Sequence, residues 1–110
     1  MIHGVLAQST VSELARAEAW YTTLFGRSPD ANPMPGLLEW RLGEGFGVQV
    51  WSEPDRAGLS TMVLAETDLD SAARRLSLEG ITEAQPERAT SSRTLELADP
   101  DGNRVVLVGL

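Results

Sequence analysis

The chain has 110 residues, the length of one domain that buries roughly 65% of its unfolded surface without disulfides or metals. Its 42% hydrophobic and 23% charged residues are typical of a globular protein. The absence of cysteine excludes a disulfide framework, a thiolate metal site and a thiol nucleophile. No apolar run reaches the roughly 18 residues of a membrane span, and the first residues lack a signal-peptide pattern, so we expect a cytoplasmic protein with no membrane partner.

The charge distribution argues against nucleic acid as a partner. The net charge is −7, and the nine basic side chains are all arginines scattered along the chain. An acidic protein without a basic patch repels phosphate backbones. We therefore expect no nucleic-acid partner.

The first quarter of the chain predicts a strand followed by a helix. Residues 2–9 are apolar and partly alternating, as in a strand. Thr10–Glu13 has a capping-box pattern and opens the stretch "ELARAEAWYTTLFG", whose apolar residues recur with helical spacing. Gly26 is the expected end of this helix.

The next segment predicts a loop and a hairpin. Residues 27–36 contain three prolines, which favour a loop. Leu37–Leu42 and Phe46–Ser52 flank Gly43-Glu44-Gly45, a pattern typical of two paired strands.

The second half repeats the same order of elements. Leu59–Ala65 is strand-like, Asp68 can cap a helix that ends near Gly80, and two or three strands follow up to Leu110. The predicted helices span a similar number of residues in the two halves, so the order indicates a duplicated β-α-β-β-β module. We expect an α+β fold with modules of about 1–53 and 59–110 and helices on one side of a curved sheet.

Three stretches carry a resemblance to a known family. "AWYTTLFGR", "ETDLDSAARRLSLEGI" and "ADPDGNRVVLV" resemble, in this order, motifs of the vicinal oxygen chelate superfamily, which includes glyoxalase I and bleomycin-resistance proteins. The resemblance covers residues 1–110 as a single domain. It implies paired β-α-β-β-β modules that form a curved, barrel-like sheet around a cavity with helices outside, usually in a homodimer.

Enzymes of this family hold a metal ion with ligands at four strand positions. The resemblance places these positions at Leu6, Gln49, Thr61 and Val106. A divalent ion needs charged or imidazole donors to offset its lost hydration, so we expect neither a metal nor another cofactor. His3 lies three residues before the first position, on the opposite face of the strand, and an exposed or capping role is expected for it.

Side-chain alternation separates two faces in each predicted hairpin. If Leu42 lies opposite Phe46, then Glu39 lies opposite Gln49 and Leu37 opposite Trp51. Residues expected to pack under the helices are Leu38, Trp40, Leu42, Phe46, Val48 and Val50 in the first half and Leu95, Leu97, Val105 and Leu107 in the second. Trp20 and Tyr21 are also predicted to pack in the core.

The opposite faces are predicted to wall the cavity. The ligand-binding candidates are Gln8, Gln49, Trp51, Thr61, Thr94, Glu96 and Val106, with Glu39 on the same wall. Such a mixture suits a ligand that is partly apolar and carries a few polar groups. Arg93 is expected to point away from this wall into a structural ion pair, and Asp99–Asn103 to form a turn rather than a site.

Three functions remain open. The favoured one is a metal-independent binding protein of the bleomycin-resistance type that sequesters or carries a small molecule. The second is a metal-free lyase or isomerase in which Glu39 or Glu96 acts as acid or base, provided that burial raises its pKa. The third is a structural or interaction domain whose cavity is filled by its own side chains. A shared fold does not by itself decide among them.

Overall fold

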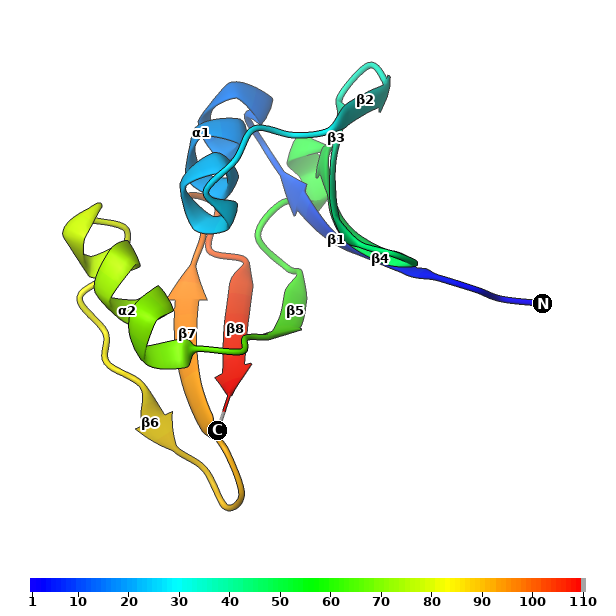
Figure 1. The fold of residues 1–110 in the computed structure, drawn as a ribbon. Helices are drawn as coiled ribbons and strands as arrows, with labels where there is room; N and C mark the ends of the chain where they lie inside the picture. The colour runs from blue at the N-terminus through cyan, green and yellow to red at the C-terminus, as the bar shows by residue number, and fades with distance from the viewer. Residues whose placement is uncertain (110) are drawn as a thin grey trace.

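Two four-stranded sheets, each covered on one face by one helix, make up the molecule (Figure 1). The computed structural model describes residues 1–109. In sheet A the strand order is β1 (Val5–Val11), β4 (Phe46–Ser52), β3 (Leu37–Gly43) and β2 (Ala31–Met34), with helix α1 (Leu14–Phe25). In sheet B it is β5 (Thr61–Ala65), β8 (Arg104–Gly109), β7 (Arg93–Ala98) and β6 (Glu87–Arg88), with helix α2 (Leu69–Leu78).

The two halves have the same topology, which confirms the predicted α+β fold built from a repeated β-α-β-β-β module. β1 runs parallel to β4, and β5 runs parallel to β8. The other neighbouring strands are antiparallel. A short 3-10 helix, η1 (Pro54–Arg56), lies on the connection between the halves. The two sheets do not join into a closed barrel.

The start of α1 differs from the prediction. β1 extends to Val11, and the residue before the helix is Glu13, whose side chain makes no capping hydrogen bond. The backbone N–H and the hydroxyl of Ser12 both donate to the carboxylate of Asp101, at 3.1 and 2.5 Å. The predicted capping box is therefore wrong, because strand pairing and this long-range contact take the place of the local hydrogen bonds. Gly26 ends the helix with φ of 71°, as predicted.

The proline-rich segment was predicted to be only a loop, and this is wrong for β2. Residues Ala31 and Met34 pair with β3, with an irregularity between them. The side chain of Asn32 donates to the Leu37 carbonyl at 2.9 Å. Pro33 is tolerated because β2 is an edge strand, where a missing N–H breaks no ladder between two neighbours.

The predicted hairpin register is confirmed over most of its length. Leu37 lies opposite Trp51 and Glu39 opposite Gln49. A shift after Arg41 places Gly43, not Leu42, opposite Phe46. A side chain on Gly43 would collide with the Phe46 ring at 2.1 Å. Phe46 is 55% exposed instead of packed in the core, and it lies at the end of the hairpin where the register shifts.

The predicted helix-facing side chains form the core, except that Phe46 is exposed and Leu42 is partly buried against it. Trp40, Val48, Val50, Leu95 and Val105 are inaccessible to solvent, and Leu38, Leu97 and Leu107 are nearly so. Tyr21 is fully buried and Trp20 is half-buried, as expected for helix packing. No helix within residues 1–109 is long and apolar enough to cross a membrane.

The turn after β7 joins the two halves. Asp99–Asn103 forms the predicted turn, in which the Asp99 carboxylate accepts from the backbone N–H groups of Asp101 and Asn103 at 2.9 Å each. The Asn103 side chain donates to the Thr10 carbonyl in β1 and accepts from the Ser60 N–H, both at 2.8 Å. This turn therefore fixes the first strand of one module to the last strand of the other.

Candidate functional site

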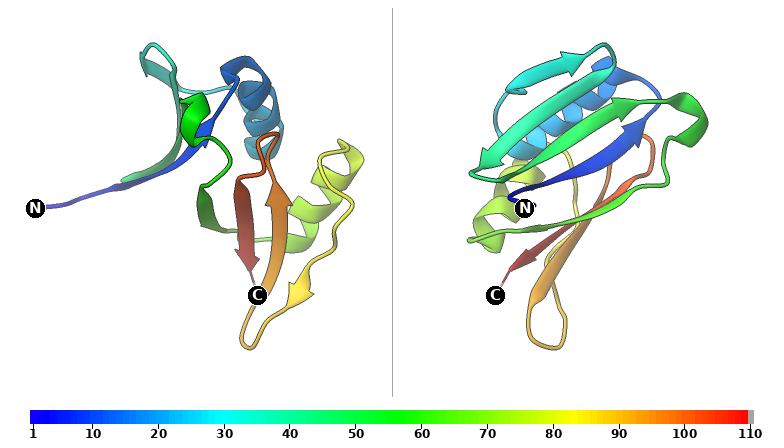
Figure 2. Two further views of the ribbon diagram at one scale, coloured as in Figure 1. Left: turned by 180° about the vertical axis from the view of Figure 1, so that it is seen from behind. Right: turned by 90° about the vertical axis from the view of Figure 1, so that its right-hand side faces the viewer.

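Each sheet has an outer face, defined as the face that points away from its helix. In the right view of Figure 2 α1 lies behind sheet A, and α2 lies to the left of β7 and β8 of sheet B. Strand register and alternation place the predicted site residues on these faces. Gln8, Glu39, Gln49 and Trp51 lie on sheet A, and Thr61, Thr94, Glu96 and Val106 on sheet B.

A row of polar side chains crosses sheet A, and we call it the ladder: Gln8, Gln49, Glu39 and Arg41. Gln8 pairs with Gln49 across β1 and β4, and Gln49 with Glu39 across β4 and β3. Gln8 Nε2 donates to Gln49 Oε1 at 3.1 Å, and Gln49 Nε2 donates to Glu39 Oε1 at 2.8 Å. Arg41 Nε donates to Glu39 Oε2 at 2.9 Å. The structure thus joins three of the predicted residues by direct contacts.

The Glu39 carboxylate is ionised and held in place. Its side chain is only 11% exposed. The hydrogen bonds from Gln49 and then from Arg41 stabilise the charged form and lower the pKa of Glu39 below its ordinary value, which outweighs the opposing effect of desolvation. The acid-base alternative required a raised pKa, so the direction found here gives proton transfer no support.

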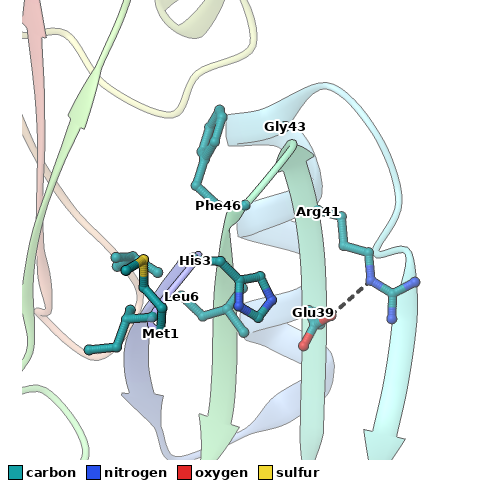
Figure 3. Close-up of a pocket in the computed structure, with 11 residues that line it drawn as sticks. Met1, His3, Leu6, Glu39, Arg41, Gly43 and Phe46 are labelled. Carbon is teal, nitrogen blue, oxygen red and sulfur yellow. Dashed lines mark hydrogen bonds and ion pairs between the residues drawn. The ribbon is translucent and has the colours of Figure 1, made fainter.

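A groove of about 820 Å³ lies beside the ladder (Figure 3). Its walls include the N-terminal residues 1–4, the apolar side chains of Leu6 and Phe46, and the ion pair of Glu39 and Arg41. Sites for small molecules have volumes of about 300–1,000 Å³ and combine apolar walls with a few polar groups. This groove fits that description.

Gly47 lies between two residues of the groove wall, one on each neighbouring strand. It lies opposite Leu6 in β1 and opposite Arg41 in β3, without a side chain of its own. A Cβ at this position would lie 2.3 Å from the Trp40 carbonyl oxygen and 3.1 Å from Leu6 Cδ2. The close approach of the strands therefore requires glycine here.

Glu39 is the one predicted site residue in the lining of this groove: Gln8, Gln49 and Trp51 lie farther along sheet A, and the other candidates lie on sheet B. Glu96 lies opposite Val106, as predicted, and forms an exposed ion pair with Arg104 at 2.7 Å. The hydrogen bond from Arg104 lowers the pKa of Glu96. Thr61 lies opposite Arg104, and Thr94 opposite Val108. Sheet B thus offers a more exposed surface than the ladder side.

Trp51 lies on the outer face of sheet A beyond the ladder. It is half-buried opposite Leu37, and its indole N–H donates to Glu53 Oε1 at 2.9 Å. The ring passes close to Gly36, where a Cβ would lie 3.5 Å from it. Arg93 points to the helix side and forms the predicted ion pair, with Asp70 at 2.8 Å.

The metal positions of the resembled family occupy corresponding places in the two modules. In β1, Leu6 lies two residues before Gln8, the partner of Gln49. In β5, Thr61 lies two residues before Val63, the partner of Val106. Two aliphatic chains, an amide and a hydroxyl do not fit a divalent ion. Within residues 1–109, no three His, Asp or Glu side chains gather into a possible metal site.

Sequence reasoning missed part of the site. The groove walls include Phe46, which was predicted for the core, and residues 1–4, which were assigned no binding role. His3 also lines the groove (Figure 3). Alternation along β3 predicts Arg41 on the same wall as Glu39, and the structure pairs the two side chains.

Solved structures with the same fold include two proteins described as binding an antibiotic. A glyoxalase/bleomycin resistance protein from Catenulispora acidiphila DSM 44928 is 29% identical, with a TM-score of 0.88 over 97% of both chains. TnmS3, an antibiotic-binding protein from Streptomyces sp. CB03234, is 24% identical, with a TM-score of 0.82 over 97% of this chain and 94% of that one. A bleomycin-binding protein in complex with bleomycin is 19% identical, with a TM-score of 0.79 over 96% and 97%. No family model and no curated protein matches the sequence.

Proposed function

We propose that this chain, which has the fold of the vicinal oxygen chelate superfamily in its glyoxalase/bleomycin-resistance form, binds a small, partly apolar molecule without a metal ion. The ligand leaves unchanged, as from a sequestering or carrier protein. The observation that carries the proposal is the groove on sheet A, where apolar walls adjoin the fixed Glu39–Arg41 pair.

Several features support binding rather than proton transfer. The carboxylates of Glu39 and Glu96 both have pKa values below the ordinary value, so neither is poised to exchange a proton near neutral pH. The ladder holds its side chains in one arrangement by direct hydrogen bonds. A rigid polar row beside an apolar groove recognises a ligand with little loss of side-chain entropy.

We further propose a homodimer in which the outer face of sheet B from one copy closes the groove on sheet A of the other. Gln8, Gln49 and Trp51 would then form one wall, and Thr61, Thr94, Glu96 and Val106 the second. Support comes from apolar side chains exposed beside both faces, which we call the apolar seam: Val5, Leu6, Phe46 and Val63. Exposed apolar patches of this kind mark interaction sites.

The test is a thermal-shift screen of antibiotics and aromatic metabolites, followed by calorimetric titration of each stabilising compound. The screen is run with a chelator and with added zinc, nickel or manganese. We expect a compound that raises Tm equally in all conditions and is recovered unchanged after incubation. Stabilisation by a metal alone, or conversion of the compound, would contradict the proposal.

A matched pair of variants locates the site. Glu39→Gln alters the ladder, and Glu96→Gln alters the corresponding position on sheet B, where the side chain is exposed. We expect Glu39→Gln to weaken binding at least tenfold and Glu96→Gln to change it only modestly. Equal effects would place the ligand elsewhere.

A further inference from the structure

The hydrogen bonds of the ladder run in one direction from Gln8 to Glu39, and the charge of Glu39 determines that direction. A side-chain amide can present either its oxygen or its NH₂ group, whereas an ionised carboxylate only accepts hydrogen bonds. Gln49 must therefore turn Nε2 toward Glu39, at 2.8 Å, which leaves its Oε1 facing Gln8. The orientation of Gln49 thus follows from the charge of its neighbour.

The same constraint passes to the next strand. Because Gln49 presents an oxygen, Gln8 must donate through Nε2, and it does so at 3.1 Å. The oxygen of Gln8 is left as the end of the row. Gln8 is exposed, and no donor from residues 1–109 reaches its Oε1. The ladder therefore starts at Glu39 in the groove wall and ends outside it, in an open hydrogen-bond acceptor two residues beyond the groove-lining Leu6 on the same face of β1.

Arg41 anchors the other end of the row. Its Nε occupies the second oxygen of Glu39 at 2.9 Å, which keeps the carboxylate from turning away from Gln49. The positive group lies at one end, and the aligned amides carry their negative ends toward Gln8. The net charge of −7 adds a field that favours cationic ligands.

Sheet B provides an internal comparison. The positions that correspond to Gln8, Gln49 and Glu39 are Val63, Val106 and Glu96, which pair across the strands in the same register. Without amides beside it, Glu96 pairs with Arg104 and its side chain is 58% exposed, against 11% for Glu39. The polar row is therefore a property of sheet A, not of the module.

We infer that Glu39 is a specificity-determining residue that polarises Gln49 and Gln8, so that the site selects ligands presenting a cationic nitrogen donor to Gln8 Oε1. The inference rests on the proposed binding function and names the ligand class for that site. Amidinium, guanidinium and ammonium groups have this chemistry, and carboxylates do not.

Two probes that share one aromatic ring test the selectivity. Benzamidine supplies a cationic donor and benzoate an anionic acceptor, and each is titrated into ¹⁵N-labelled protein while the side-chain NH₂ signals of Gln8 and Gln49 are followed. We expect benzamidine to shift both signals and to bind at least tenfold more tightly than benzoate. Equal binding, preference for benzoate, or no response to either probe would overturn the inference.

Variants separate this inference from the proposed function. Glu39→Gln and Gln8→Leu should each reduce the preference for benzamidine to less than threefold, whereas Glu79→Gln, at the C-terminal end of α2, should keep it. Gln8→Leu leaves the contacts of Glu39 intact, so it tests the acceptor even if Glu39→Gln folds poorly. If a compound from the thermal-shift screen binds on sheet A but cationic ligands are not preferred over anionic ones, the inference about Glu39 is wrong and the proposed binding function is still supported.

Discussion

The hydroxyl of Tyr21, in α1, lies 2.8 Å from the carboxylate of Asp99, at the end of β7. The two residues belong to different modules and are separated by 78 positions in the chain. Ser9 Oγ, from β1, also lies 2.8 Å from the hydroxyl, and all three side chains are buried. The phenol donates to the carboxylate and accepts from the serine, so the helix of one module is bonded to the turn of the other.

Replacing Tyr21 by Phe should destabilise the protein. The substitution keeps the ring but removes one of the hydrogen bonds to the buried Asp99 carboxylate and the hydrogen bond between the phenol and the buried Ser9 hydroxyl. The loss in the free energy of unfolding should be about 1–3 kcal/mol, measured by urea denaturation. Thr23→Ala is the control, because that hydroxyl bonds only to the Ala19 carbonyl within α1, and its effect should stay within about 0.5 kcal/mol. Equal losses in the two variants would contradict the role of the Tyr21 hydroxyl.

The burial of Tyr21 predicts that the protein loses stability at alkaline pH. Burial, followed by the neighbouring negative charge of Asp99, raises the pKa of Tyr21 far above its ordinary value of 10.0. Above pH 10 the unfolded state releases the phenol proton, whereas the folded state retains it. The free energy of unfolding therefore falls as pH rises, by up to about 1.4 kcal/mol per pH unit.

The chain is well suited to this measurement. It contains one tyrosine, no lysine and no cysteine, so phenolate absorbance reports Tyr21 alone. We expect phenolate to appear only together with unfolding, followed by tryptophan fluorescence, and Tyr21→Phe to lack the alkaline slope. Phenolate formation near pH 10 in the folded protein would show that the hydroxyl is accessible.

Gln49→Leu should raise the pKa of Glu39. The hydrogen bond from Gln49 is the main cause of the lowered pKa, and its loss leaves the Arg41 contact and desolvation to compete. The carboxyl ¹³C shift of Glu39, followed against pH, gives the value. Gln8→Leu is the control, because it leaves the Gln49 donor in place, and it should move the midpoint less. If the titration midpoint of Glu39 is unchanged in Gln49→Leu, Arg41 alone lowers the pKa of Glu39.

The proposed dimer predicts a concentration-dependent change of mass. Val63 is 62% exposed in the apolar seam, and an arginine there would be buried without a partner in the dimer. Val63→Arg should therefore raise the dissociation constant at least about tenfold, as measured by analytical ultracentrifugation. Leu78→Arg, at an 89% exposed position on α2, should leave it unchanged. A wild-type protein that stays monomeric at high concentration would refute the dimer.

Much of the fold could be predicted because local pattern and tertiary packing agree. Alternation in β3 and β4 predicts the pairs of Glu39 with Gln49 and of Leu37 with Trp51, and both are present. Asp68 caps α2 through Ser71, as its position before an apolar helix indicates. These elements satisfy their own hydrogen bonds and bury one face, so neighbouring residues suffice to identify them.

Other features depend on residues far apart in the chain. Ser12 bonds to Asp101 instead of capping α1, and β2 pairs with β3 despite the three prolines in and beside it. Alternation placed Gln8, Gln49 and Glu39 on one wall, but only the side-by-side order of β1, β4 and β3 joined them into a hydrogen-bonded row.

The sequence by itself determined the repeated module, its apolar faces and the absence of metal-binding side chains at the family's positions, because these depend on residue type and spacing. Only the tertiary structure decided the groove, the hydrogen-bond direction of the ladder and the junction around Asp99. Those features arise where strands distant in sequence lie side by side, and local patterns carry no information about the distance or orientation between such side chains.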